Sequence, residues 1–153
     1  MLISIVPALK KQGQDQAIGC SKGGLSTKIQ ATVDALGYPT GFLLTPGQAC
    51  DLDGADVLWP AIEAPIVIAD KGYAADQRVL QLLAQAGKTA VIPPKANRKE
   101  QRPYDREQYK ARHRIENFFC QLKQFRALAT RYDKTARNFL AAIHLAAAII
   151  WLN

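Results

Sequence analysis

The amino-acid sequence predicts a mixed α/β fold built as a single domain. Two strand-like runs, residues 28–33 and 40–44, are separated by turn residues, and residues 64–69 form a short uninterrupted apolar run. Residues 104–127 instead repeat their apolar positions with the period of a helix. The chain has 153 residues, of which 48% are hydrophobic, so it is large enough to bury one core.

The first third of the chain is predicted to hold a loop and a β-hairpin. Residues 12–26 are rich in Gly, Gln and Ser, a composition typical of loops. Residues 28–33 alternate with β-branched side chains, and residues 40–44 form a second apolar run. Between them, residues 34–39 carry Gly and Pro, which favour a reversal of the chain. These features predict an antiparallel pair of strands.

The middle of the chain predicts strands that alternate with helices. A helix is expected from about residue 51 to 62, because aspartates near its start can cap exposed backbone N–H groups. The apolar run 64–69 is typical of a strand buried on both faces. Asp70 follows at its carboxyl end, the edge of an open α/β sheet at which ligands bind. A helix over 76–86 and a strand over 89–92 complete this unit.

The last third of the chain predicts helices. A basic loop over 95–103 precedes the long helix, and a final helix covers about 136–151. The final helix contains the apolar run 139–152, whose length of about 14 residues is below the roughly 20 that span a bilayer. We therefore expect a buried helix and no membrane contact. The first residues lack the pattern of a signal peptide. The three cysteines stand far apart with no metal-binding or disulfide spacing, which favours a reducing cytoplasm.

Positive charge is concentrated in one segment. The net charge is +7, and residues 95–137 hold 13 Lys and Arg against 5 Asp and Glu, whereas the rest of the chain holds 7 against 8. A basic segment of this kind favours contact with nucleic acid, although a solvated basic face is the ordinary alternative. The candidate phosphate contacts in and near the loop are Lys71, Lys95, Arg98, Lys99 and Arg102.

Four chemically active side chains share one strip of the long helix. At about 100° per residue, Tyr109, Arg112, Glu116 and Lys123 span about 60° of arc. A carboxylate flanked by two cations and a phenol suits a metal-assisted reaction on a phosphate backbone. Two ordinary roles remain open: Arg112 and Glu116 as an i,i+4 pair that braces the helix, and Tyr109 as a packing residue.

The spacing Y-x2-R-x3-E-x6-K, present here as YKARHRIENFFCQLK, resembles the signature of DDE transposases from bacterial insertion sequences, in the group related to insertion sequences four and five. The similarity extends from about Asp15 to the C-terminus. Five further stretches carry it in order: GCSKGGLSTKIQATVDALGYP, LLTPGQACDLDGAD, VIADKGY, VIPPKANRK and ATRYDKTARNFLAAIHLAAAIIWL.

The resemblance implies a ribonuclease-H-like fold, in which helices flank a mixed sheet. In such enzymes two aspartates and one glutamate hold two Mg²⁺ ions that act on DNA. By position, Asp70 in ADKGY corresponds to the second aspartate and Glu116 to the glutamate, so both are predicted to be catalytic and metal-binding. Tyr109, Arg112 and Lys123 are then expected to contact DNA phosphates.

The first aspartate of the family has no counterpart here. The chain begins MLISIVPALKK, no acidic residue precedes Asp15, and Leu2 stands about where the aspartate belongs. Residues 1–11 are therefore expected to be the remnant of a truncated opening strand. Residues 12–26 would follow as a loop, and 104–153 would form the C-terminal helices. Three further departures from the family pattern are Cys20, Gln30 and Ala74.

The resemblance predicts that residues 1–153 form a single partial catalytic domain. Its expected function is metal-dependent cleavage and strand transfer of insertion-sequence DNA in a bacterial cytoplasm, with an upstream polypeptide that provides the first aspartate. The expected partners are transposon ends, target DNA, that upstream polypeptide and a second copy of the chain. Two alternatives remain: a non-catalytic DNA-binding or interaction module that poisons transposition, and a metal-dependent nuclease unrelated to transposition.

Overall fold

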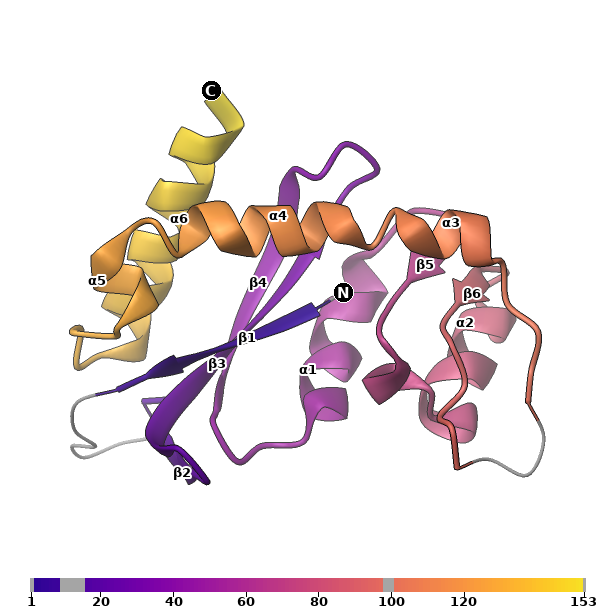
Figure 1. Ribbon diagram of the computed structural model, residues 1–153, viewed down its shortest axis with the longest axis horizontal. Helices are drawn as coiled ribbons and strands as arrows, with labels where there is room; N and C mark the ends of the chain where they lie inside the picture. The colour runs from indigo at the N-terminus through magenta and orange to yellow at the C-terminus, as the bar shows by residue number, and fades with distance from the viewer. Residues whose placement is uncertain (1, 9–15, 98–100, 153) are drawn as a thin grey trace.

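The computed structural model describes residues 2–8, 16–97 and 101–152, without the side chains of 2–4, 76 and 77. Its strands are β1 (Leu2–Pro7), β2 (Gly19–Ser21), β3 (Gly24–Val33), β4 (Pro39–Pro46), β5 (Ile66–Ile68) and β6 (Thr89–Val91). Its helices are α1 (Asp51–Leu58), α2 (Gln81–Gln85), α3 (Arg106–Lys110), α4 (His113–Leu122), α5 (Arg126–Ala129) and α6 (Ala136–Leu152). Short η turns occupy Trp59–Ala61, Lys71–Tyr73 and Asp76–Leu80. The mixed α/β class is confirmed (Figure 1).

Strand β3 is the centre of an antiparallel sheet. β1 pairs antiparallel with β3, from Leu2 opposite Ala31 to Pro7 opposite Ser26. β4 also pairs antiparallel with β3, from Pro46 opposite Thr27 to Pro39 opposite Val33. The predicted hairpin of β3 and β4 is confirmed. Its turn is held by Asp34, whose Oδ1 accepts hydrogen bonds from two backbone N–H groups, those of Leu36 (2.8 Å) and Tyr38 (2.9 Å).

Residues 12–15 of the loop expected over residues 12–26 lie outside the described residues, and the prediction was wrong for residues 19–26. β2 and the start of β3 form a second, small hairpin within it, with Cys20 opposite Leu25. Hydroxyl groups stabilise this hairpin, because Ser21 donates to the carbonyl of Gly24 (3.1 Å) and Ser26 donates to Ser21 (2.9 Å). Polar residues thus form strands here through pairing with β3 rather than through an apolar pattern of their own.

The second unit contains a two-stranded parallel sheet, β5 beside β6, with α1 and α2 around it. The helix expected to begin with an aspartate cap instead has Cys50 as its N-cap residue, with no side-chain cap. The strand predicted over residues 64–69 is shorter, since β5 covers only Ile66–Ile68, and the prediction of burial on both faces was wrong for residues 64–66, which are exposed, and for Ile68, which is half-buried. Val67 is buried, but Ile66 is 42% exposed, because the two-stranded sheet leaves this side of β5 open to solvent.

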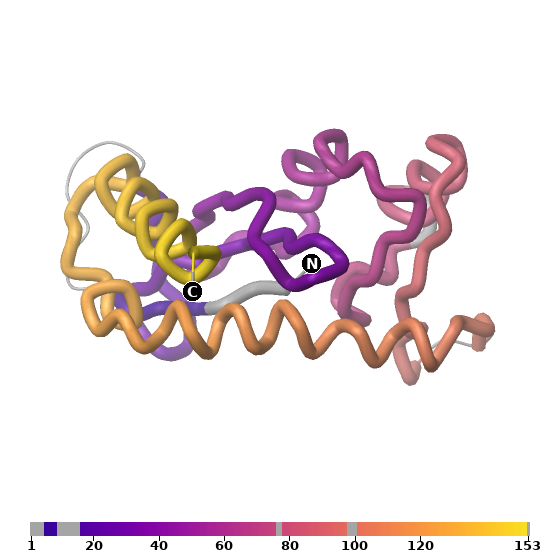
Figure 2. The backbone as a smooth tube through the Cα atoms, turned by 90° about the horizontal axis from the view of Figure 1, so that it is seen from above, coloured from indigo at the N-terminus to yellow at the C-terminus, as the bar shows by residue number. Residues whose placement is uncertain are grey.

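The long helix predicted over residues 104–127 is divided. α3 and α4 are separated by a tight turn in which Ala111 and Arg112 donate to carbonyls three residues back, those of Gln108 and Tyr109 (both 3.0 Å). His113 explains the interruption, because its ring Nδ1 donates to the carbonyl of Lys110 (2.7 Å), the acceptor that a continuing helix would use. Figure 2 shows that α3 and α4 nevertheless follow one line along the molecule.

Two clusters of buried side chains lie on opposite sides of the antiparallel sheet. Ile29 and Ala31 of β3 point into the cluster formed with α4 and α6, which includes Phe118 and Phe139. The alternate residues of β3 face α1, where Gln30 lies against Gly54. The second cluster joins α1 to β5, α2 and the Lys71–Tyr73 turn. Helix α6 is the predicted final helix, but the expectation that it is buried was wrong for one side, where Leu145, Trp151 and Leu152 are exposed. Within the described residues no helix is long and apolar enough to cross a membrane.

Candidate active site

Asp70 lies at the carboxyl end of β5, where the strand leads into the Lys71–Tyr73 turn. It is the N-cap residue of this turn, and its Oδ1 accepts a hydrogen bond from the backbone N–H of Lys71 (2.7 Å). The carboxylate is therefore held at the edge of the parallel sheet and is only partly buried. This is the strand-end position that the sequence predicted for it.

Tyr109 of α3 is the residue through which the helix reaches Asp70. Burial is the largest cause that raises the pKa of Tyr109, and Arg112 opposes it. The negative charge of Asp70 and a hydrogen bond to that carboxylate raise the pKa further. Tyr104 packs edge-on against Tyr109, with ring centroids 5.5 Å apart. The first residue of the Y-R-E-K signature therefore lies beside the predicted second aspartate.

Arg112 connects Tyr109 to Glu116. Its guanidinium lies 5.5 Å from the centre of the Tyr109 ring, and its Nη2 is 2.7 Å from Oε1 of Glu116. The side chains of Arg112 and Glu116 are 23% and 45% exposed, so the pair is open to solvent on one side. Asp70, Tyr109, Arg112 and Glu116 thus form a continuous series of contacts, which we call the Asp70–Glu116 strip.

The two carboxylates lie at opposite ends of this strip. Tyr109 and Glu116 are separated by about 10 Å along the helix axis, because each residue rises by about 1.5 Å. Lys123, at the C-terminal end of α4, is exposed and lies roughly 10 Å farther along. In the part of the chain that the structure describes, no three His, Cys, Asp or Glu side chains gather closely enough to hold a metal ion. The convergence of Asp70 and Glu116 on one cation remains a prediction.

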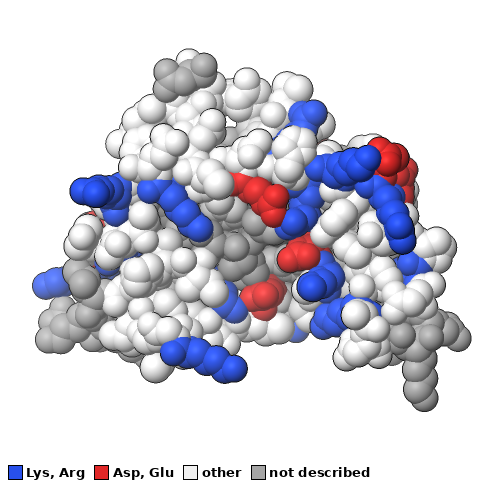
Figure 3. All heavy atoms as spheres, viewed as in Figure 1, with Lys and Arg blue, Asp and Glu red and all other residues white. Residues whose placement is uncertain are grey.

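The predicted basic contacts differ in how exposed they are. Lys71 and Lys95 are exposed, Arg102 is partly buried, and Arg98 and Lys99 lie outside the described residues. Figure 3 shows acidic side chains near the middle of one face, with Lys and Arg on either side of them. Such an arrangement allows cations to neutralise phosphates close to carboxylates.

The sequence of the chain matches the family model described as the transposase DDE domain, over residues 6–151. The chain belongs to this family. A protein of Brucella ovis named as a transposase for insertion sequence element IS6501 is 38% identical over 130 residues, which are 84% of this chain and all of that protein. No solved structure matched the chain. Membership of the transposase family, expected from the motifs, is confirmed.

The family is associated with a divalent metal, and the donors of this transposase domain fit one in kind. Asp70 and Glu116 offer carboxylate oxygens, which are the ligands that Mg²⁺ prefers. Both are partly exposed and therefore accessible to an ion and to DNA. Their present hydrogen-bond donors are the backbone N–H of Lys71 and the guanidinium of Arg112.

One residue of the basic segment has a role that the sequence did not reveal. Arg131 is 1% exposed, and its guanidinium donates to Oγ1 of Thr27 (2.7 Å) and to the carbonyl of Asp133 (3.0 Å). It also lies 4.9 Å from the centre of the Phe139 ring. Loss of solvation on burial lowers the pKa of Arg131, although the charge of Asp133 opposes this. Counting charges along the chain could not distinguish this inward arginine from those available to DNA.

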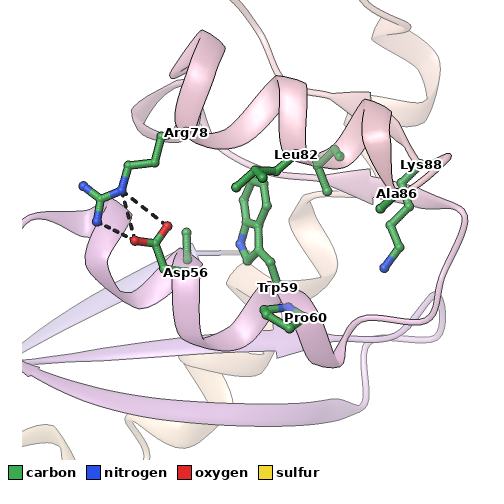
Figure 4. Close-up of a pocket in the computed structure, with 9 residues that line it drawn as sticks. Asp56, Trp59, Pro60, Arg78, Leu82, Ala86 and Lys88 are labelled. Carbon is green, nitrogen blue, oxygen red and sulfur yellow. Dashed lines mark hydrogen bonds and ion pairs between the residues drawn. The ribbon is translucent and has the colours of Figure 1, made fainter.

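A cavity of about 260 Å³ lies between α1 and α2, apart from the Asp70–Glu116 strip. Trp59 and Leu82 provide its apolar walls, and Lys88 lies at its rim (Figure 4). At the other end, Arg78 pairs with Asp56, with 2.5 Å between Nη2 and Oδ2. No residue of the strip lines this cavity, and no sequence pattern predicted it.

Proposed function

We propose that this chain is the catalytic-domain portion of an insertion-sequence transposase that cleaves DNA and transfers strands with divalent metal. Asp70 and Glu116 are its metal-binding carboxylates. The observation that carries the proposal is the contact series from Asp70 through Tyr109 and Arg112 to Glu116, because it joins the strand-end aspartate to the family's helical signature. A ribonuclease-H-like fold is the arrangement that the family implies for such a site.

Asp70 and Glu116 would hold Mg²⁺, and the chemistry that this ion would supply is activation of water or a 3′-hydroxyl and stabilisation of a leaving oxygen. The residues around the carboxylates bind and orient the DNA. Arg112 and Lys123 neutralise phosphate charge, the first through a planar fork and the second as a point charge. Tyr109 lies between Asp70 and Arg112 and fixes their separation.

The expected partners follow from the same proposal. Transposon ends and target DNA bind across the basic face, with contacts to phosphates that weaken strongly as salt increases. An upstream transposase polypeptide provides the first aspartate, whose position is taken here by Leu2. Two copies of the chain bring the two transposon ends together.

The decisive experiment mixes the chain with the upstream polypeptide, Mg²⁺ and labelled transposon ends. Glu116→Gln keeps the shape of the side chain but removes its charge, so we expect strand transfer to be lost and DNA binding to remain. Glu107→Gln is the matched control, because Glu107 lies on the preceding helix and pairs only with exposed Lys110 (2.8 Å) among the described residues. Undiminished strand transfer by the Glu116→Gln chain would refute the proposal.

A second function, a DNA-binding module without catalysis, is favoured by one observation. Among the described side chains no cluster of three potential metal ligands exists. A truncated transposase of this kind would occupy transposon ends and inhibit the complete enzyme. It predicts DNA binding with no strand transfer in any mixture, together with inhibition when the chain is added to an active transposase.

A further inference from the structure

Asp51 is an acidic residue that the resemblance leaves without a role. It is the first residue of α1, which packs against the Lys71–Tyr73 turn. Its Oδ1 accepts a hydrogen bond from Nζ of Lys28 (2.6 Å), a side chain that is only 12% exposed. Its Oδ2 lies 3.9 Å from the position that a Cβ atom would take on Gly72. One carboxylate oxygen of Asp51 is thus fixed by lysine, and the other faces the turn capped by Asp70.

The other acidic residues of α1 form ion pairs with an arginine. Asp53 and Asp56 both pair with Arg78, with Oδ1 of Asp53 2.9 Å and Oδ2 of Asp56 2.5 Å from its Nη2. The hydrogen bonds that Arg78 donates to these carboxylates are the main reason that its pKa is raised. Asp51 therefore differs from its neighbours in directing an oxygen toward the end of β5.

A buried hydroxyl group beside these carboxylates has no partner. Tyr73 is 2% exposed, and its hydroxyl is buried without a hydrogen bond to any residue that the structure describes. Besides burial, which is the largest cause, the charges of Asp51 and Asp70 raise the pKa of Tyr73. Buried hydroxyls are normally paired with protein or water. A water molecule on a cation held by the two aspartates is a partner of the required kind.

We propose that Asp51 is a further metal ligand of this chain and, together with Asp70, holds a divalent cation beside the Lys71–Gly72 turn. This inference rests on the proposed function, since the cation is the one that the transposase chemistry requires. Two carboxylates are enough for such a site, because Mg²⁺ keeps several water ligands and binds to one or two carboxylates plus phosphate oxygens. Lys28 is a positioning residue that orients the Asp51 carboxylate.

Binding of Mn²⁺, measured by the loss of the electron paramagnetic resonance signal of the free ion, tests the assignment without DNA. We expect Asp51→Asn to weaken Mn²⁺ binding by at least about tenfold, as Asp70→Asn does, because each removes a charged ligand. Asp53→Asn is the control and is expected to bind as the unchanged chain does. Equal affinity of the Asp51→Asn and unchanged chains, or no binding by the unchanged chain, would overturn the proposal.

A second measurement uses the unchanged chain, so it does not depend on the folding of a variant. Fe²⁺ bound at the site, with ascorbate and peroxide, generates hydroxyl radicals that cut nearby backbone. We expect cuts near Gly72 and Cys50, suppressed by excess Mg²⁺ and located by mass spectrometry. Cuts confined to other segments, or cuts that Mg²⁺ does not suppress, would contradict a cation between Asp51 and Asp70.

Tyr73→Phe separates the metal role from a structural one. It removes only the hydroxyl, so we expect the metal-free chain to unfold at the same temperature or slightly above. Mn²⁺ affinity is expected to fall about twofold or more, since the metal-bound water loses an acceptor or donor. Unchanged Mn²⁺ affinity in this variant would remove the hydroxyl from the site and count against the assignment.

The outcomes distinguish this inference from the proposed function. Strand transfer that survives Asp51→Asn but not Glu116→Gln would refute the role of Asp51 and leave the transposase proposal standing. Mn²⁺ binding that requires Asp51 and Asp70, without strand transfer in any mixture, would refute the catalytic proposal and support the metal site.

Discussion

Two arginines of the same basic segment have opposite environments. Arg131 is 1% exposed, and its hydrogen bonds go to neutral oxygens of the chain, including Oγ1 of Thr27. Arg112 has a partly exposed side chain and one carboxylate partner, Glu116, which is more exposed still. The comparison shows that an arginine whose hydrogen bonds lie inside the protein serves the fold, whereas one with a solvent-accessible partner can exchange it for a phosphate.

The largest effect is expected at the buried arginine. Arg131→Met would leave the Thr27 hydroxyl and the carbonyl of Asp133 without their donor, so we expect the free energy of unfolding to fall by about 2–4 kcal/mol. Urea unfolding measures this change. Arg126→Met is the control, because Arg126 is exposed on α5. A loss no greater than that of the control would show that the buried contacts contribute little.

The next effect concerns Gln30, another polar side chain that is fully buried. A Cβ added at Gly54 would overlap the side-chain amide of Gln30, which donates to Thr45 (3.2 Å). Gly54→Ala is therefore expected to destabilise the chain by about 1–3 kcal/mol, even though alanine is the better helix former by about 1 kcal/mol. Thermal unfolding checks this, with Gly23→Ala as control because that site is open. A stabilised Gly54→Ala chain would show that the amide moves aside easily.

A smaller change in stability is expected at the strip. Arg112→Met removes one partly exposed i,i+4 ion pair, so the free energy of unfolding should fall by only about 0.5 kcal/mol. DNA affinity should fall at the same time, and the slope of log affinity against log salt should decrease in magnitude by about 1. Filter-binding titrations at several salt concentrations measure both quantities. A stability loss as large as that of Arg131→Met would erase the distinction between the two arginines.

The smallest structural effect is expected at Lys123, which is exposed at the end of α4. Lys123→Gln should leave the unfolding temperature unchanged and reduce the salt slope of DNA binding by about 1. Exposed Lys110, whose Nζ lies 2.8 Å from Glu107, provides the matched control. If Lys110→Gln and Lys123→Gln weakened DNA binding equally, position along the signature would carry no special weight.

The sequence predicted those elements whose local pattern agrees with their surroundings. Residues 89–92 and 136–151 were placed close to β6 and α6, because their apolar patterns match the positions that become buried. The small hairpin over residues 19–26 was missed, because its strands depend on pairing with β3 and on serine hydroxyls. Its sequence alone has the composition of a loop.

The site was predicted in part for the same reason. Helical spacing correctly brought Arg112 and Glu116 into contact, because both lie within one helical turn of each other. The interruption before His113 was not predicted, since it results from a side chain that takes the carbonyl of Lys110. The approach of Asp51 to Gly72 could not be predicted from the sequence either, because it depends on how α1 packs against a turn about 20 residues later.

The side chains of strand β3 alternate between two faces of the sheet, and each face has a different neighbour. Ile29 and Ala31 belong to the apolar cluster under α4, whereas Lys28 orients Asp51 and Gln30 lies against α1. Inserting or deleting a single residue in this strand would exchange the two sets, sending lysine into hydrocarbon and isoleucine toward the carboxylates. Changes in chain length should therefore be tolerated at the tip between β3 and β4. They should not be tolerated within β3, where the same alternation of side chains supplies both the apolar core and the residues near the carboxylates.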